Sequence, residues 1–217
     1  MATWETYDGS AVELDDCADG RVYFRADPEN PNTDGFHKAD WNHGEVWTHY
    51  FKTVKSVKAG GNIQFLLEST GTRMDVPASG FYQLFGKSEY NEETGESTGS
   101  CSSLTTAPEL PATTLADSCY ASMFRDCQSL ETAPSLPATT LASSCYAAMF
   151  WNCQSLETAP DLPAENLAAS CYSTMFLNCK SLTKPPAISA KKLNMSCYNS
   201  MFSGCSSLAT APELPVE

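Results

Sequence analysis

The chain has 217 residues, of which 42% are hydrophobic, and its 26 acidic and 13 basic side chains give a formal net charge of -13. This length accommodates one or two domains with a substantial core, and the apolar content excludes a disordered chain. The acidic surface repels phosphate backbones, so we expect no nucleic-acid partner. We also expect no membrane insertion, because no run of about 18 apolar residues occurs.

The N-terminal part, residues 1–60, predicts a small all-β domain. It begins with MATWETYDGS, which lacks the basic and apolar regions of a signal peptide. The segments Arg21–Ala26 and Glu45–Lys58 have the composition of strands, whereas Asp15–Gly20 and Asp27–Gly35 are typical of turns or loops. We expect a sandwich-like domain that caps the first open end of the domain that follows.

Two groups of residues in this part could in principle hold a metal ion. His37, His43 and His49 are spaced by six residues. Along a strand this spacing covers about 20 Å, so only a hairpin could gather the three side chains around one ion. The oxygen-rich loop Asp27–Gly35 lacks the EF-hand spacing for calcium. We therefore interpret both groups as ordinary surface and loop residues, and predict neither a metal nor a cofactor.

The C-terminal part is built from a repeat of 26 residues. One unit reads C-x-S-L-x-x-A-P-x-L-P-A-x-x-L-A-x-x-C-Y-x-x-M-F-x-x. Such a period is the mark of a solenoid, in which each unit contacts only its neighbours. Two cysteine columns follow the period, one formed by Cys101, Cys127, Cys153, Cys179 and Cys205 and the other by Cys119, Cys145, Cys171 and Cys197.

The second half of each unit has the spacing of a short helix. Leu115, Cys119, Met123 and Cys127 follow one another at intervals of four residues, and this is one face of a helix. Thr113 or Thr114 could cap its start. With one short strand in the first half of each unit, the pattern predicts an α+β solenoid that has a parallel sheet on one face and helices on the other.

A recurrent proline limits the length of the strand in each unit. Because proline cannot donate a ladder hydrogen bond, it marks a strand end or a bulge. We expect ladders of about two to four residues per unit, with Leu104, Ala107 and Leu110 as inward positions in the first regular unit. The prolines concerned are Pro108, Pro134, Pro160, Pro186 and Pro212.

The repeat also extends upstream in a degenerate form. In the segment Ala78–Phe85, Phe81, Leu84 and Phe85 match Tyr120, Met123 and Phe124 of the first regular unit. The acidic stretch 86–100 then intervenes, and its composition predicts a solvated loop. We therefore divide the chain into the β domain 1–60 and a solenoid 61–217, with a degenerate first unit 61–100 and regular units 101–217.

The unit CxSLxxAPxLPAxxLAxxCYxxMFxxC resembles the Treponema-type, or BspA-like, leucine-rich repeats of bacterial surface proteins, which are common in gut Bacteroidetes and have relatives in phage-encoded proteins. The resemblance covers about residues 78–217, and Gly61–Leu67 is similar to the line that ends the domain before such repeats. The chain departs from the pattern in the insertion 86–100 and at Lys184–Ser189. The resemblance implies a leucine-rich-repeat solenoid with a binding or adhesive role and no catalytic residues.

The cysteines of the repeat are expected to fill space in the core. Free cysteine behaves as a small buried hydrophobic residue. Cys119 and Cys127 would lie about 12 Å apart along a helix, which is too far for a disulfide. Scattered disulfides and a metal site are the alternatives, although no C-x-x-C pair occurs.

The outward columns of the strand face are the predicted ligand-binding face, since solenoids bind on such extended surfaces. A plain solvated face is the alternative. On another edge, Trp151 and Leu177 form a candidate hot spot, unless Trp151 packs under a neighbouring loop. The face comprises Thr106, Glu109, Glu131, Thr132, Glu157, Thr158, Asp161 and Lys184.

The sequence favours a non-catalytic binding or adhesion module over an enzyme. No nucleophile elbow, phosphate loop or zinc-protease motif occurs. We expect a protein or glycan ligand and a location that is extracellular, on a bacterial cell surface or on a phage particle. A structural spacer and an accessory domain of a carbohydrate-active protein are the alternatives.

Overall fold

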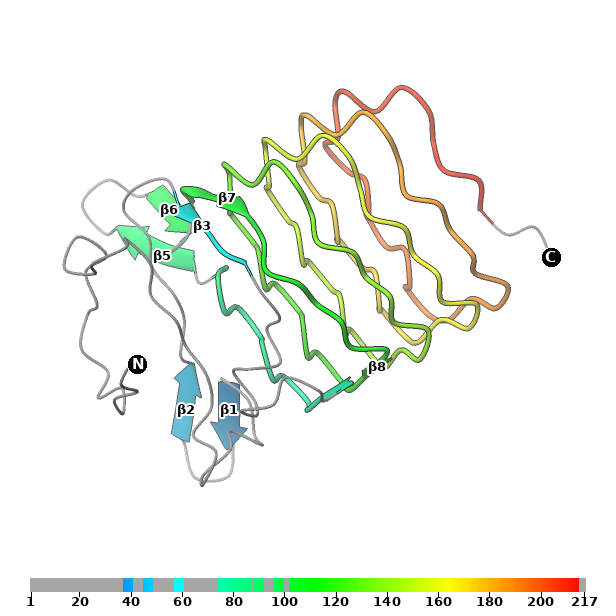
Figure 1. Ribbon diagram of the computed structural model, residues 1–217, viewed down its shortest axis with the longest axis horizontal. Helices are drawn as coiled ribbons and strands as arrows, with labels where there is room; N and C mark the ends of the chain where they lie inside the picture. The colour runs from blue at the N-terminus through cyan, green and yellow to red at the C-terminus, as the bar shows by residue number, and fades with distance from the viewer. Residues whose placement is uncertain are drawn as a thin grey trace, which may run out of the picture.

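The computed structural model describes residues 37–40, 45–48, 57–60, 74–86, 88–91, 96–99 and 102–214. Successive 26-residue units from residue 102 onward lie side by side as a stack of turns, coloured from green to red in Figure 1. The strands and bridges that join neighbouring units pair in parallel wherever the structure describes them. The leucine-rich-repeat assignment and the domain boundary at residue 60 stay predictions.

Two short parallel ladders run along the stack. In the first, β3 (Val57–Lys58) pairs with β7 (Leu104–Thr106), and single bridges Thr106↔Thr132 and Thr158↔Lys184 continue it. In the second, β4 (Asp75–Val76) pairs with β8 (Thr114–Leu115), and the bridge Thr114↔Thr140 follows. The short pairing agrees with the limit that the prolines set. Thr113 and Thr114 belong to this second ladder, so the expected helix cap is wrong.

The second half of each unit is a series of turns rather than a helix, which corrects our expectation; the part of the chain that the structure describes contains no helix. We call this segment the turn arc. Every fourth residue in it has a positive φ, for example 54° at Ser118, 54° at Ser122 and 59° at Asp126, and a left-handed residue ends any α-helix. The arcs comprise residues 78–86, 117–126, 143–152, 169–178 and 195–204.

Hydrogen bonds within and between the arcs explain why the chain accepts this conformation. Amide groups alternate along each arc. Those of Ala121 and Met123 bond back to carbonyls three residues earlier, whereas the amide of Tyr120 donates to Cys145 of the next unit at 3.0 Å. The backbone is thereby satisfied without a helix. Because the turns also repeat every four residues, the stripe of residues expected on a helix face is buried all the same.

Aromatic columns form the centre of the stack. Phe81, Tyr120, Tyr146, Tyr172 and Tyr198 stack with ring centroids 5.8–6.0 Å apart. A second column runs from Phe85 through Phe124, Phe150 and Phe176 to Phe202, with spacings of 5.4–5.7 Å. These stacked rings confirm the alignment of Ala78–Phe85 with the regular units.

The insertion after the first arc is not a plain loop. β5 (Ser88–Asn91) and β6 (Glu96–Gly99) pair as an antiparallel hairpin with the register Ser88↔Gly99 to Asn91↔Glu96. The expectation of an unstructured loop is therefore wrong for these residues. The stretch has little apolar content, and the cross-strand pairing of its backbone is what the structure describes of it.

In the N-terminal part, β1 (His37–Asp40) and β2 (Glu45–Thr48) form a second antiparallel pair. β2 coincides with the start of the strand expected over Glu45–Lys58, and β3 coincides with its end. Outside the described residues lie the expected strand Arg21–Ala26, the loop Asp27–Gly35 and the segment Gly61–Leu67, and so does the sandwich as a whole.

Candidate functional site

The first ladder and the segment after it carry the predicted ligand-binding face. Thr132, Thr158 and Lys184 lie at the same position in successive units, because parallel bridges keep the ladder in register. Their side chains are exposed, as are those of Glu109, Glu131, Glu157 and Asp161, whereas Thr106 in β7 is half-buried. The structure therefore brings the residues of this face together as neighbouring columns.

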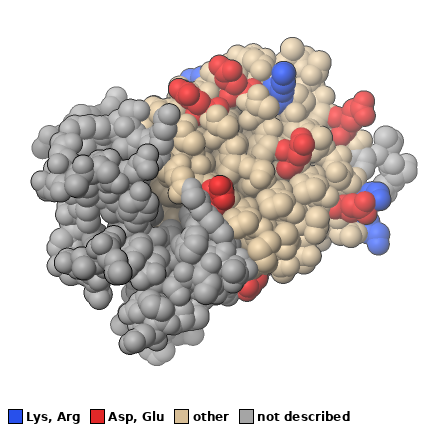
Figure 2. Space-filling view, viewed as in Figure 1, with Lys and Arg blue, Asp and Glu red and all other residues tan. Residues whose placement is uncertain are grey.

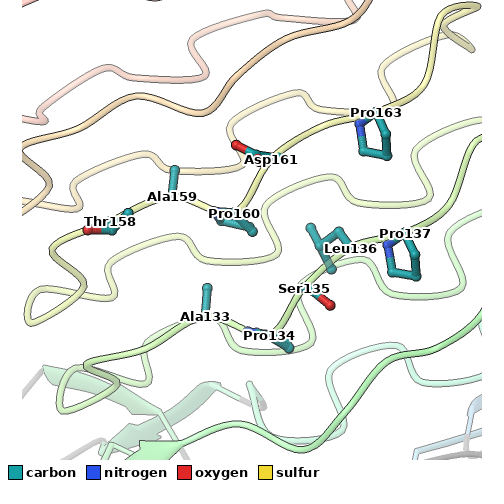
Figure 3. Close-up of a pocket in the computed structure, with 10 residues that line it drawn as sticks. All are labelled: Ala133, Pro134, Ser135, Leu136, Pro137, Thr158, Ala159, Pro160, Asp161 and Pro163. Atoms are coloured by element: carbon teal, nitrogen blue, oxygen red, sulfur yellow. The ribbon is translucent and has the colours of Figure 1, made fainter.

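A shallow hollow of about 510 Å³ opens on this face between two successive units. Thr158 and Asp161 lie on its border (Figure 3). Four prolines dominate the lining, as the pairs Pro134 with Pro160 and Pro137 with Pro163 from equivalent positions of the two units (Figure 3). The hollow is thus rigid and largely apolar, since proline fixes its own backbone and carries no amide donor.

A second hollow of about 300 Å³ adjoins the first and adds carboxylate groups to it. It is lined by Glu131, Thr132, Glu157 and Thr158, together with residues 133, 159 and 160. Over the visible side of the stack, Figure 2 shows acidic groups that are spread out rather than gathered in one cluster. The two hollows together offer an apolar floor with hydroxyl and carboxylate groups beside it.

Backbone contacts hold parts of this face in place. The Asp161 carboxylate accepts a hydrogen bond from the amide of Ala187 at 3.3 Å, and the Thr183 hydroxyl donates to the Glu157 carbonyl at 3.2 Å. Asp161 therefore also stabilises the contact with the next unit. A substitution there would change both the surface and the stack.

The structure packs the predicted edge hot spot rather than leaving it open. The guanidinium of Arg125 lies over the Trp151 ring, 4.0 Å from its centroid, and its Nε is 3.4 Å from the Asp126 carboxylate. A cation over an indole face is a stabilising contact. Trp151 and Leu177 are both half-buried. Trp151 thus packs against a side chain of the preceding unit, whereas the alternative to a hot spot is packing under a neighbouring loop.

The buried thiols and phenols are poorly suited to act as nucleophiles. All eight cysteines of the described part are buried. Burial raises the pKa of Cys145 and of Cys171 to about 12, and it raises that of Cys153 well above its ordinary value. Burial likewise raises the pKa of Tyr120. Such groups stay protonated near neutral pH, and a reactive thiol must be ionised.

Of the candidate metal-binding histidines and the oxygen-rich loop, the structure describes only His37. His37 starts β1, whereas His43, His49 and the loop Asp27–Gly35 lie outside the described residues. Within the described ranges no group of three or more His, Cys, Asp or Glu side chains could hold a metal ion. Those ranges also contain no helix long and apolar enough to cross a membrane.

Sequence reasoning missed the prolines as lining residues of the larger hollow. It used Pro134 and Pro160 only to limit strand length, although the period also places Pro137 and Pro163 beside them. The recurrence of both prolines in the first three regular units, before Ser189 replaces the second one, was the signal for a rigid strip. Comparison with known proteins identifies no relative, because no protein-family model, curated protein or solved structure matches this chain.

Proposed function

We propose that this protein is a non-catalytic binding or adhesion module that holds a protein or glycan ligand on the face defined above. One observation carries the proposal: both hollows lie on that face and include Glu131, Thr132, Glu157, Thr158 and Asp161. Binding sites are concave and combine apolar lining with a few polar groups. The stack presents such a site on a rigid, repetitive surface, as solenoid proteins do.

The chemistry of the hollows favours a polypeptide over a glycan. Prolines, Ala133 and Leu136 give an apolar floor, and no aromatic ring lines either hollow. The neighbouring carboxylates of Glu131 and Glu157 would complement basic side chains and speed their encounter with the acidic protein. The ligand we favour is an extended segment with apolar and basic side chains.

The setting we propose is a bacterial cell surface or a phage particle, on the strength of the resemblance of the repeat to BspA-like proteins. A spacer role would need the regular stack but no hollow. An accessory role in a carbohydrate-active protein would need a glycan on the same face. The three functions therefore differ in what binds at the hollows.

Protein and glycan arrays probed with the full chain test the proposal. The variant Thr158→Arg fills the larger hollow and repels basic side chains, so we expect it to weaken binding of a captured ligand by about tenfold, which is about 1.4 kcal/mol. Ser143→Arg adds the same side chain to an exposed position of a turn arc and serves as the control. Equal binding by Thr158→Arg would place the ligand elsewhere, and no ligand on either array would favour the spacer.

A further inference from the structure

The backbone-to-backbone hydrogen bonds between turn arcs all run in one direction along the stack. The amides of Ser122 and Phe124 donate to Ala147 and Met149 of the next unit at 2.8 and 3.0 Å. The same pattern recurs one unit later, where Tyr146 donates to Cys171 at 3.1 Å. Each arc therefore gives donors to the unit that follows it and acceptors to the unit that precedes it.

The carbonyls of these donor residues are occupied within their own arc. Ser122 accepts a bond from Arg125 at 3.1 Å, and Phe124 accepts one from Cys127 at 3.1 Å. The side of an arc that faces the C-terminal end of the stack thus offers mainly amide donors, and its one backbone acceptor towards the next unit is the phenylalanine carbonyl, which takes a cysteine thiol there. An ordinary β edge differs, because it offers both groups in alternation.

The last arc leaves this row of donors open. Among the residues that the structure describes, no acceptor meets the amides of Ser196, Tyr198, Ser200, Phe202 and Gly204. The carbonyls of the first four again bond internally, to the amides of Asn199, Met201, Ser203 and Cys205, at 3.1–3.2 Å. We call the row formed by the five amides the donor edge.

Apolar groups beside the donor edge are also left without cover. Leu193 is 46% exposed, whereas Leu167 at the equivalent position one unit earlier is 6% exposed. Met195 is 74% exposed. Tyr198 and Phe202 end the two aromatic columns, each with a stacked neighbour on one side only within the described residues.

We propose that the donor edge binds a polypeptide segment in the conformation of a turn arc, with a carbonyl at every second residue and two aromatic rings four residues apart. The surface is separate from the proposed ligand-binding face, and the inference does not depend on that function. The reason is that the donor edge is equivalent to the surface by which each earlier arc contacts the next arc. The partner rings would extend the columns of Tyr198 and Phe202.

The polarity of the donor edge also disfavours a second copy of this chain that binds by its own donor edge. Two copies of this chain that met by the same edge would place amide donors against amide donors, with the Phe202 carbonyl as the one comparable backbone acceptor on each side, so most of these amides would stay unpaired. Unpaired buried amides are costly, by about 1–3 kcal/mol each. The edge therefore selects a partner of opposite polarity and resists pairing with itself, which protects it from end-to-end aggregation.

Amide hydrogen exchange on the full chain tests the proposal, with the peptide ATTLASSCYAAMFWN, which copies residues 138–152, as the probe. At a peptide concentration ten times the dissociation constant, we expect exchange at the five donor-edge amides to slow about tenfold. Asn199, Met201 and Ser203 alternate with them and already bond internally, so their exchange should change little.

Matched variants distinguish hydrogen-bonded binding of the peptide at the donor edge from non-specific apolar association. A peptide with serine in place of its tyrosine and phenylalanine should not slow exchange. Phe202→Lys should weaken binding of the original peptide, whereas Ser203→Lys, which adds the same charge one residue away, should not. No slowing up to the solubility limit, or uniform slowing along the arc, would overturn the proposal. So would self-association of the chain through this edge, measured by light scattering without peptide.

Discussion

At the scale of single residues, the two cysteine columns have different environments. In the column of Cys153, the described thiols donate to a phenylalanine carbonyl, which lies 29 residues earlier for three of them and 42 residues earlier for Cys127. The sulfur–oxygen distances are 3.1 Å for Cys153 to Phe124, 3.0 Å for Cys179 to Phe150 and 3.0 Å for Cys205 to Phe176. In the other column Cys145 is equally buried, but its thiol has no such acceptor within the described residues. One column therefore contributes a hydrogen bond as well as volume.

This difference predicts opposite responses to serine and alanine. Cys153→Ser keeps a donor for the Phe124 carbonyl, so it should destabilise the chain no more than Cys153→Ala, which should cost about 1–2 kcal/mol. At Cys145 the serine hydroxyl would be buried without an acceptor, so Cys145→Ser should cost about 1 kcal/mol more than Cys145→Ala. Urea unfolding of the four variants measures the two differences. If the serine and alanine variants rank in the same order of stability at both positions, the difference in hydrogen bonding between the two columns is wrong.

At the scale of the element, the turn arc depends on residues that tolerate a left-handed backbone. The positions with positive φ carry Ser, Ala, Thr, Asn, Asp, Gln and Gly and no β-branched aliphatic residue. Asn and Asp adopt this conformation more readily than most residues. Asn152 also donates a side-chain hydrogen bond to the Asp126 carboxylate of the preceding unit at 2.8 Å. These positions therefore shape the arc and link it to its neighbour.

The adjacent residues Ala147 and Ala148 provide a matched test of the arc. Ala148 has a φ of 54°, whereas Ala147 has no positive φ. Glycine relieves about 1–2 kcal/mol of strain at a left-handed position and costs about 0.5–1 kcal/mol in unfolded-state entropy elsewhere. We expect Ala148→Gly to be neutral or stabilising by up to about 1 kcal/mol, and Ala147→Gly to be destabilising by about 0.5–1 kcal/mol. Equal losses in urea unfolding would show that the arc has another backbone conformation.

At the scale of the whole molecule, the hairpin of β5 and β6 is an addition to the stack. Among the strands that the structure describes, the hairpin strands contact only each other. Gly86, which precedes the hairpin, is different. A Cβ atom on Gly86 would overlap the carbonyl oxygen of Ser122 and lie 2.5 Å from the amide nitrogen of Arg125 in the next arc. The packing of the first two arcs therefore requires the absence of a side chain at Gly86.

Deletion of the hairpin and substitution of Gly86 should therefore differ in their effect on the free energy of unfolding. Replacing Lys87–Ser100 with two residues and keeping Gly86 should change the free energy of unfolding by about 1 kcal/mol or less, because loop closure depends weakly on length. Gly86→Ala should cost about 1–3 kcal/mol or more, because the arcs must move apart. Thermal unfolding compares the two variants with the parent chain. A large loss of stability in the deletion variant would mean that the hairpin supports the core.

Several features of this protein could be predicted from its sequence because they repeat or depend on local chemistry. The 26-residue period gave the unit boundaries, and the identical apolar positions indicated which columns face inward. The prolines limited the ladders, since a missing donor acts wherever it occurs. Burial of the cysteines and exposure of Thr132, Glu157 and Thr158 followed from the same periodicity.

Only the tertiary structure decided between a helix and the turn arc. A repeat of four residues buries the same stripe in both conformations, so Cys119, Met123 and Cys127 could not distinguish them. The deciding hydrogen bonds, such as that of Tyr120 to Cys145 at 3.0 Å, join residues one unit apart and exist only after the units stack. The proline-lined hollow and the donor edge arise from the same cause. The hollow is formed by two neighbouring units, and the donor edge is formed by the last arc that the structure describes, so neither can be read from one segment alone.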